Sequence, residues 1–509
     1  MQIEPNTTVK FLLNCPLNKD YNHTLFFENK TLQFNYFSTL EMWTIDKQTY
    51  QRVDSRTIRV EKPIRSLINC NYMMFKNTDF ENKWFYAFID SVKYISNNTT
   101  EVTYEIDVMQ TWFFDCSLKQ CFVEREHSLT DNIGDNIVEE KIGTGEYVLN
   151  KTVDLTDLTN CHIAVFATFN KEFEDNVGGL INGVYSGLCI NFFDLTETGV
   201  AECNTFLNEA TERKKSDGIV AIMILPVFYA PEIGVDTNEF SFEPNLDYFG
   251  NIDDNKWYTP KNKKLFTYPY NFLYVSNMCG TNAIFPFELF RDGYNFKYYV
   301  DSSPNTSAIL VPQEYKGVRE NWDEKITISN FPMCSYNIDA YKVYCAQNAV
   351  PQIISGVTSL TTLGVGIATE NPMLIAGGAV GIANILGGHI QAQREPPQSK
   401  GAQSPSTLFS ADKLTFVFMQ KQVRIEYAKI IDDFFTAYGY ATNQIKVPNI
   451  SSRPRWNYVK TIDCYMTGHA PSEAIKKICE IFNRGVTFWK NGDDIGNYNL
   501  DNSPLGVIE

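Results

Sequence analysis

The longest apolar stretch of the chain lies between Lys342 and Arg394. Residues 343–393 carry one formal charge, Glu370, although charged residues make up 20% of the 509 residues. Glu370-Asn371-Pro372 divides the stretch into two apolar arms, residues 349–368 and 373–390. A helical arm of this length spans about 27–30 Å, close to the hydrocarbon thickness of a bilayer. Because Asn-Pro favours a turn and proline cannot continue a helix, the pattern predicts an apolar hairpin with a polar tip.

The composition of the two arms leaves two interpretations open. Eight glycines between Gly356 and Gly388, together with Ser and Thr, lower the helix propensity of both arms in water. Lipid tolerates glycine better, and the Gly377 to Gly381 spacing lets helices approach closely. The alternative is a pair of buried core helices or a Gly-rich loop. Because the rest of the chain has the composition of a soluble, core-forming protein, we expect a conditional membrane segment, sheltered in one state and inserted in another.

Alternation of apolar and polar positions predicts strands in the first quarter of the chain. In residues 101–108 every even position is apolar and every odd position is charged or polar, which gives one dry face and one wet face. The run 84–95 precedes it across the turn-forming residues 96–100, so the two runs are predicted to form a hairpin. Residues 52–60 are a further amphipathic strand candidate.

Strand and helix patterns alternate in the rest of the chain. Further strands are predicted at residues 161–169, 219–228, 266–275, 414–419, 441–447 and 456–466. Residues 205–215 are predicted to form a short helix. An amphipathic helix that ends at Gly439 has a predicted apolar face of Val423, Tyr427, Ile430, Ile431, Phe434 and Tyr438. The last predicted helix, residues 471–483, begins at a proline and ends before Gly485.

Composition and charge narrow the class of protein. The chain is 44% hydrophobic and 14% aromatic, which excludes general disorder and favours strand-rich structure. Its length suits about two to four domains. A formal net charge of −16 argues against binding of a phosphate backbone, and it suits a channel through which DNA slides without sticking.

Candidate chemistry is sparse. The twelve cysteines are scattered without a CxxC pair, so we expect free thiols, made in a reducing cytosol, in place of a zinc site or a small disulfide framework. The N-terminal residues MQIEPNTTVK have neither the basic nor the apolar region of a secretory signal. The five histidines are far apart in sequence and are interpreted as core or surface residues.

No catalytic motif is present in the sequence. HExxH, GxxxxGK[ST] and GxSxG do not occur. Adjacent acidic pairs such as Asp253-Asp254, Asp432-Asp433 and Asp493-Asp494 resemble what glycan cleavage needs, but 60 acidic residues produce such pairs by composition alone. We therefore expect no enzyme, no cofactor and no bound metal, and a peptidoglycan hydrolase is the least favoured alternative.

Aromatic-rich motifs near the two ends of the chain resemble a known family. The N-terminal motifs are residues 71–77 (NYMMFKN), 82–88 (NKWFYAF), 105–112 (EIDVMQTW) and 125–127 (REH). The C-terminal motifs are Phe434-Phe435, Tyr438-Gly439-Tyr440, Asn457-Tyr458-Val459, Asp463-Cys464 and residues 494–498 (DIGNY). Together these ends are similar to the tail-knob, or distal tube, proteins of small short-tailed phages of Gram-positive bacteria. The central region, residues 123–344, shows little likeness and looks shorter than in family members.

The resemblance implies a structural virion protein. In that family a homohexamer closes a mostly β tube at the tip of the tail, and the tube carries DNA outward. Long apolar loops plug the tube until they are released to form a channel in the host cytoplasmic membrane. The implied partners are further copies of this chain, other phage tail proteins, membrane lipid, and double-stranded DNA that passes without specific binding. The implied location is the tail tip of the virion, and the host membrane during infection.

The resemblance and the apolar pattern together define the expected architecture. The fold class is α+β and mostly β, with barrel-like tube domains in a hexameric ring and an inserted apolar hairpin. The expected divisions are an N-terminal β tube domain (1–130), a middle β-rich region (131–342), the apolar loop with its linker (343–405) and a C-terminal α+β domain that packs with the N-terminal one (406–509).

The predicted membrane-active loop is the candidate site. Its residues are Val350, Ile353, Ile354, Val357, Leu360, Leu363, Val365, Ile367, Glu370, Pro372, Met373, Leu374, Ile375, Gly377, Gly381, Ile382, Ile385 and Leu386. The alternative function is a tail adhesin in which Tyr and Trp near the two ends of the chain stack on cell-wall sugars, although most of these residues have strand periodicity and are better explained as core.

Overall fold

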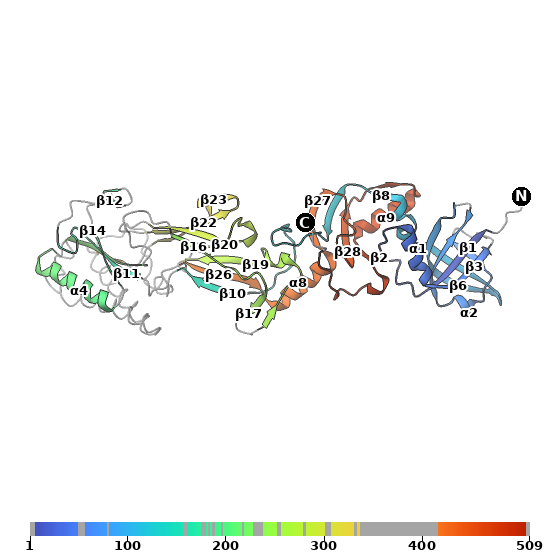
Figure 1. Cartoon of the computed structure of the whole chain (residues 1–509), viewed down its shortest axis with the longest axis horizontal. Helices are drawn as coiled ribbons and strands as arrows, with labels where there is room; N and C mark the ends of the chain where they lie inside the picture. Colours follow the sequence, from blue (N-terminus) through green and yellow to red (C-terminus); the bar gives the residue numbers. More distant parts are fainter. Residues whose placement is uncertain are drawn as a thin grey trace, which may run out of the picture. The chain divides into compact units, whose positions relative to one another are not determined.

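The structure is a computed structural model that divides the chain into two compact units. Unit 1 comprises residues 1–144, 259–265 and 426–509, and unit 2 comprises residues 145–258 and 266–425. The residues it describes are 6–48, 56–78, 81–155, 161–174, 180–181, 184–185, 189–194, 197–215, 218–226, 238–251, 256–277, 281–300, 307–329, 333–335 and 416–504. Each unit is built mainly of β-strands (Figure 1).

The first sheet of unit 1 is antiparallel, with the strand order β3-β1-β5-β6-β7-β4. The strands are β1 (Thr7–Leu13), β3 (Glu41–Gln48), β4 (Thr57–Val60), β5 (Cys70–Lys76), β6 (Trp84–Ser96) and β7 (Thr99–Ile106), and the helices between them are α1 (Lys30–Thr39) and α2 (Ile64–Leu67). The sheet is curled and buries residues on both faces, since Met73 and Tyr72 belong to two separate core clusters. Because successive side chains of β5 point to opposite faces of the sheet, this strand contributes residues to both cores.

The predicted hairpin of residues 84–108 is confirmed, with a correction at its end. β6 and β7 pair antiparallel from Ala87↔Ile106 to Ser96↔Thr99. β7 ends at Ile106, because Asp107 caps the short helix α3 (Val108–Trp112) by accepting hydrogen bonds from the amides of Met109 and Gln110 at 3.0 and 3.1 Å. Val108 continues the alternation of apolar and polar residues by coincidence, because it lies in α3 and not in the strand.

The second sheet of unit 1 combines strands from both ends of the chain. Its order is β2-β30-β28-β9-β27. The strands are β2 (His23–Leu25), β9 (Cys121–Glu126), β27 (Tyr440–Lys446), β28 (Trp456–Ile462) and β30 (Val486–Trp489). β9 lies between β27 and β28 and pairs antiparallel with each. Figure 1 shows these N-terminal and C-terminal strands side by side.

The strand predicted for residues 456–466 is confirmed for its first seven residues as β28, but it ends earlier than predicted. β28 ends at Ile462, and β29 (Met466–Gly468) pairs with β8 (Cys116–Leu118) as a separate two-stranded sheet. Asp463 adopts a φ of 54°, which no extended strand accommodates, so the chain turns there. The strand predicted at 441–447 is confirmed as β27.

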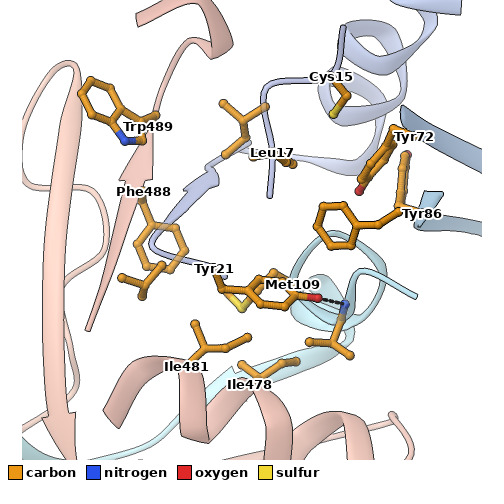
Figure 2. Packing of buried hydrophobic residues seen from close by; sticks show 14 of the residues in the cluster. Cys15, Leu17, Tyr21, Tyr72, Tyr86, Met109, Ile478, Ile481, Phe488 and Trp489 are labelled. Atoms are coloured by element: carbon orange, nitrogen blue, oxygen red, sulfur yellow. Dashed lines mark hydrogen bonds between the residues drawn. The ribbon is translucent and has the colours of Figure 1, made fainter. Parts of the chain in front are cut away.

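One apolar core joins the two ends of the chain (Figure 2). Helix α9 (Ser472–Arg484) buries Ile478, Ile481 and Phe482 against residues of the N-terminal strands. In Figure 2, Ile478 and Ile481 face Tyr21 and Met109, and the Val108 amide donates a 3.3 Å hydrogen bond to the Tyr21 hydroxyl oxygen. The predicted helix at 471–483 is confirmed, and Gly485 ends it with a φ of 97°.

Helix α8 (Ile425–Tyr438) is confirmed, but its predicted buried face is partly wrong. Tyr427 and Ile430 are 39% and 66% exposed, whereas Asp432 is fully buried. The Asp432 carboxylate accepts hydrogen bonds from the amides of Lys261 and Asn262 at 2.8 and 3.0 Å. These partners, about 170 positions away, rotate the helix so that a charged residue faces inward. Periodicity alone cannot predict this.

The described residues of unit 2 form three larger sheets. Their orders are β10-β26-β19-β20, β14-β11-β15-β25, and β16-β21-β22-β23 with β24 also on β22; β12-β13 and β17-β18 are small pairs. The strands are β10 (Tyr147–Asp154), β11 (Cys161–Ala167), β12 (Leu180–Ile181), β13 (Val184–Tyr185), β14 (Cys189–Asp194), β15 (Ile219–Pro226), β16 (Asn238–Ser241), β17 (Phe249–Asn251), β18 (Lys256–Tyr258), β19 (Asn271–Ser276), β20 (Asn282–Phe285), β21 (Asn295–Val300), β22 (Ser307–Tyr315), β23 (Val318–Glu320), β24 (Ile326–Ser329), β25 (Met333–Ser335) and β26 (Val417–Val423).

Sequence predictions for unit 2 hold best where strands are fully apolar. The strands predicted at 161–169 and 219–228 are confirmed as β11 and β15. The strand predicted from residue 266 begins later, at Asn271, because residues 263–266 form a 3₁₀ helix. The predicted helix at 205–215 is α4 (Glu197–Glu212), which begins eight residues earlier than predicted because its first turns are largely polar. The mostly β fold predicted from the sequence is confirmed.

The shared core of unit 1 leads to a stability prediction. Phe482 in α9 is fully buried, and Phe482→Ala is expected to lower the free energy of unfolding by about 3–5 kcal/mol, because it leaves a cavity. Ile430→Ala, on the exposed face of α8, is expected to cost less than about 0.5 kcal/mol. Urea unfolding followed by tryptophan fluorescence measures both values. Equal losses for the two variants would contradict the shared core.

Asp107 gives a pH prediction. Burial raises the pKa of this carboxyl from 3.8 to about 6, although hydrogen bonds from Gln110, Tyr72 and Met109 oppose the rise. The folded state therefore favours the protonated form, and the wild type loses stability relative to Asp107→Asn as pH rises from about 4 to 7, by at most roughly 3 kcal/mol. Urea unfolding across this range measures the difference, with Asp433→Asn on α8 as the control. A constant difference between wild type and Asp107→Asn would contradict the shift.

Candidate functional site

The predicted membrane-active loop, from Val350 to Leu386, lies outside the described residues. What the structure describes are the nearest strands on either side of it, β25 before and β26 after. In the described ranges, no helix is long and apolar enough to cross a membrane. Nor does a group of three or more metal-ligating side chains gather within those ranges.

Strand β26 begins shortly after the apolar stretch and its linker, and it is held on both edges. It pairs antiparallel with β10 and with β19, and Figure 1 shows it between them. Val153 and Val275 are both register partners of Phe418. Phe418 is fully buried in an apolar core of unit 2, where its ring lies 5.1 Å from that of Phe296. β26 is thus an interior strand of its sheet.

Two buried glutamines fix one face of β26. Gln420 accepts a 2.8 Å hydrogen bond from the Asn245 amide and donates to the Asn245 carbonyl at 2.7 Å and to Asn271 Oδ1 at 3.0 Å. Gln422 accepts a 2.7 Å hydrogen bond from Asn150 Nδ2 and donates to the Gly250 carbonyl. Both glutamine side chains are fully buried, and the oxygen and nitrogen of each side-chain amide have a hydrogen-bond partner. We call Gln420, Gln422 and these hydrogen bonds the glutamine clamp.

The glutamine clamp was missed by sequence reasoning. The predicted strand stopped at Met419, because Gln420, Lys421 and Gln422 are polar. Their partners lie 149 to 272 positions away, so no local signal marks them as buried. Lys421, on the opposite face, places its ammonium 3.7 Å from the centre of the Tyr274 ring.

Strand β25 is paired less extensively than β26 among the described strands. Its three residues pair with β15 through Met223↔Met333, Ile222↔Cys334 and Ala221↔Ser335. Among the described strands β25 lies at the edge of its sheet, with one neighbour. Among the described strands, the one before the apolar stretch is therefore a short edge strand, and the one after it is a seven-residue interior strand.

Unit 1 contains a buried ion cluster beside an open cleft. Glu140 pairs with Lys264, whose Nζ lies 2.7 Å from Oε1, and with Arg125. Burial, followed by repulsion from Arg125, lowers the pKa of Lys264 to about 7. The cleft of about 610 Å³ is lined by both charged and aromatic side chains, among them Glu124, Arg125, Glu140, Phe434, Tyr438 and Tyr458. Such a lining offers rings for stacking and polar groups for hydrogen bonds.

His127, the most buried histidine of unit 1, is a core residue. His127 Nδ1 accepts a 2.7 Å hydrogen bond from the Tyr458 amide, and Nε2 lies 3.1 Å from the Thr436 carbonyl. Burial lowers the pKa of the imidazole to about 3, so it stays neutral. Its role is to join β9 to the C-terminal strands.

Comparisons with known proteins assign the class and then the family. Residues 5–117 match the N-terminal model of caudoviral major tail proteins, which places the chain among the structural tail proteins of phages. Residues 237–503, just over half of the chain, match the model of the C-terminal domain of tail knob protein gp9 of Bacillus phage phi29. The chain belongs to this family of tail knob proteins. It is accordingly a structural component of a phage tail.

Individual relatives agree with this assignment. The chain is 25% identical to the tail knob protein gp9 of Bacillus phage PZA over 97% of this chain and 98% of the relative. It is 26% identical to that of phage B103, with the same coverage. The solved tail knob protein gp12 of bacteriophage C1 has a TM-score of 0.65 at 14% identity, covers 97% of this chain and 99% of its own, and shows the same fold.

The expected family is confirmed, and the likeness extends further than the sequence motifs indicated. The motifs lay at the two ends, whereas the alignments include the middle of the chain.

The glutamine clamp leads to the next prediction. Gln420→Ala is expected to lower the free energy of unfolding of unit 2 by about 2–4 kcal/mol, because it leaves buried groups of Asn245 and Asn271 without partners. Gln444→Ala is the matched control, since Gln444 is an exposed strand residue of β27, and it should cost less than about 0.5 kcal/mol. Chemical denaturation measures both. A small loss for Gln420→Ala would show that the clamp is dispensable.

Proposed function

We propose that this tail knob protein forms a homohexameric tube that conducts double-stranded DNA, and that its apolar segments plug the tube and are released to form a channel in the host cytoplasmic membrane. The observation that carries the proposal is the apolar stretch of residues 343–393, with its single charge at Glu370. Two arms of bilayer-spanning length, joined by a turn, are what a membrane-inserting hairpin requires. The net charge of −16 favours unhindered passage of DNA.

Exposure to water is too costly for such segments before infection. Six copies would present twelve apolar arms, far more than the few hundred Å² of apolar patch that soluble proteins tolerate. At about 25 cal/mol for each Å², the penalty is large enough to require shelter, and the interior of a tube provides it. The apolar segment must also stay attached to the rest of the protein after its release. The glutamine clamp on β26, the strand that follows the segment, supports such an attachment.

Deletion of Val350 to Ile390, with a Gly/Ser linker of equal length in its place, tests the membrane role. We expect the variant to assemble with the same mass as the wild type and to lose leakage of dye-loaded liposomes. Analytical ultracentrifugation and dye release measure the two properties on the same preparation. Unchanged leakage would remove the membrane claim, and a monomeric mass for the wild type would remove the hexamer.

The alternative function is a tail adhesin, and the cleft of unit 1 favours it. Tyr438 is 41% exposed and lies 5.1 Å, ring to ring, from Tyr458, beside the charged groups of the cleft. Aromatic faces next to hydrogen-bonding side chains suit a sugar. Co-sedimentation of wild type and Tyr438→Ala with purified cell walls distinguishes the two functions, because the channel proposal requires no wall binding by this cleft.

A further inference from the structure

Three cysteines that are scattered in the sequence come together in unit 1. Cys121 begins β9, Cys464 lies two residues after β28, and Cys479 lies in α9. Cys464 and Cys479 pack against the same core cluster, and the Cys479 and Cys121 thiols lie close enough to Cys464 to contribute to the rise in its pKa. All three are free thiols in this structure.

Backbone and amide contacts fix this arrangement. The Cys464 amide donates a 3.0 Å hydrogen bond to Asn483 Oδ1, and Thr461 Oγ1 donates to the same oxygen at 2.9 Å. Asn483 lies one helical turn after Cys479, so the two side chains share a face of α9. The end of β28 is therefore pinned to the helix face that carries Cys479. On the other side, the register pair Phe122↔Ile462 brings Cys121 near the same place.

Exposure distinguishes the members of the cluster. Cys464 and Cys479 are partly exposed, whereas Cys121 is only 6% exposed. Burial raises the pKa of both Cys464 and Cys479, so only a small fraction of either is thiolate at neutral pH and reaction with an oxidant is slow. The pair is thus preserved as thiols during synthesis in a reducing cytosol, and solvent oxidants reach it afterwards.

We propose that Cys464 and Cys479 form a disulfide once the virion has left the reducing cytosol. A thiolate of the pair attacks a small-molecule disulfide to give a mixed disulfide and one released thiol. The second thiolate then displaces the other half, so that two protein thiols are oxidised, the small disulfide is reduced to two thiols, and two protons leave the protein. The bond joins the end of β28 to α9, beside the core that holds the chain's two ends together.

Peptide mapping of the purified full-length protein tests the bond directly. Trypsin cleaves after Lys460, Lys476, Lys477 and Arg484, which separates Cys464 (residues 461–476) from Cys479 (residues 478–484). After overnight exposure to oxidised glutathione, we expect these two peptides as one linked species by mass spectrometry, and as separate species after reduction. Absence of the linked species would overturn the proposal, as would a dominant link between Cys464 and Cys121.

A thermal measurement with matched variants completes the test. Oxidation is expected to raise the Tm of unit 1 by about 5–10 °C, since the bond closes a short loop in the unfolded chain. Cys479→Ser should abolish this gain. Cys189→Ser, which removes a partly exposed thiol of unit 2, should keep both the gain and the linked peptides. Cys121→Ser should also keep them, and loss of the Tm gain in that variant would show that Cys121 is the true partner.

Discussion

The pairing of β9 with β27 and β28 is the interaction on which the architecture depends. β9 ends the N-terminal part of the chain, yet both of its neighbours come from the last 70 residues, with Glu126 in register with Tyr440 and Val459. The main core of unit 1 has the same dependence, because α9 covers residues of the N-terminal strands. Unit 1 therefore cannot form its second sheet until the C-terminal strands are present. Non-local pairing of this kind delays folding until the entropy of closing a long loop has been overcome.

Unit 2 is consequently an insertion between two halves of one unit. Only residues 259–265 of the intervening chain belong to unit 1, where the amides of Lys261 and Asn262 donate to the buried carboxylate of Asp432. Loop-closure entropy grows slowly with length, so such a chain tolerates large changes in the inserted part. The alignments with relatives, which extend over 594 positions for a chain of 509 residues, are consistent with this tolerance.

Sequence patterns predicted those elements whose causes are local. The hairpin of β6 and β7 follows from alternation, and α9 follows from a proline at its start and a glycine after its end. Predictions failed where distant partners decide burial: Asp432 turns the face of α8, and Gln420 and Gln422 extend β26 beyond its apolar part. The same reason hid the cysteine cluster. The candidate hairpin was predicted from apolarity alone and lies outside the described residues, which include β25 before it and β26 after it.

The contrast between β25 and β26 sets the order in which the fold can open. Among the described strands, β25 has one ladder of three residues to break, whereas β26 must break two ladders and release two buried side-chain amides. Sub-global opening proceeds from the region of lowest local stability. Under mechanical or thermal strain, β25 is therefore expected to separate from β15 before β26 separates from β10 and β19.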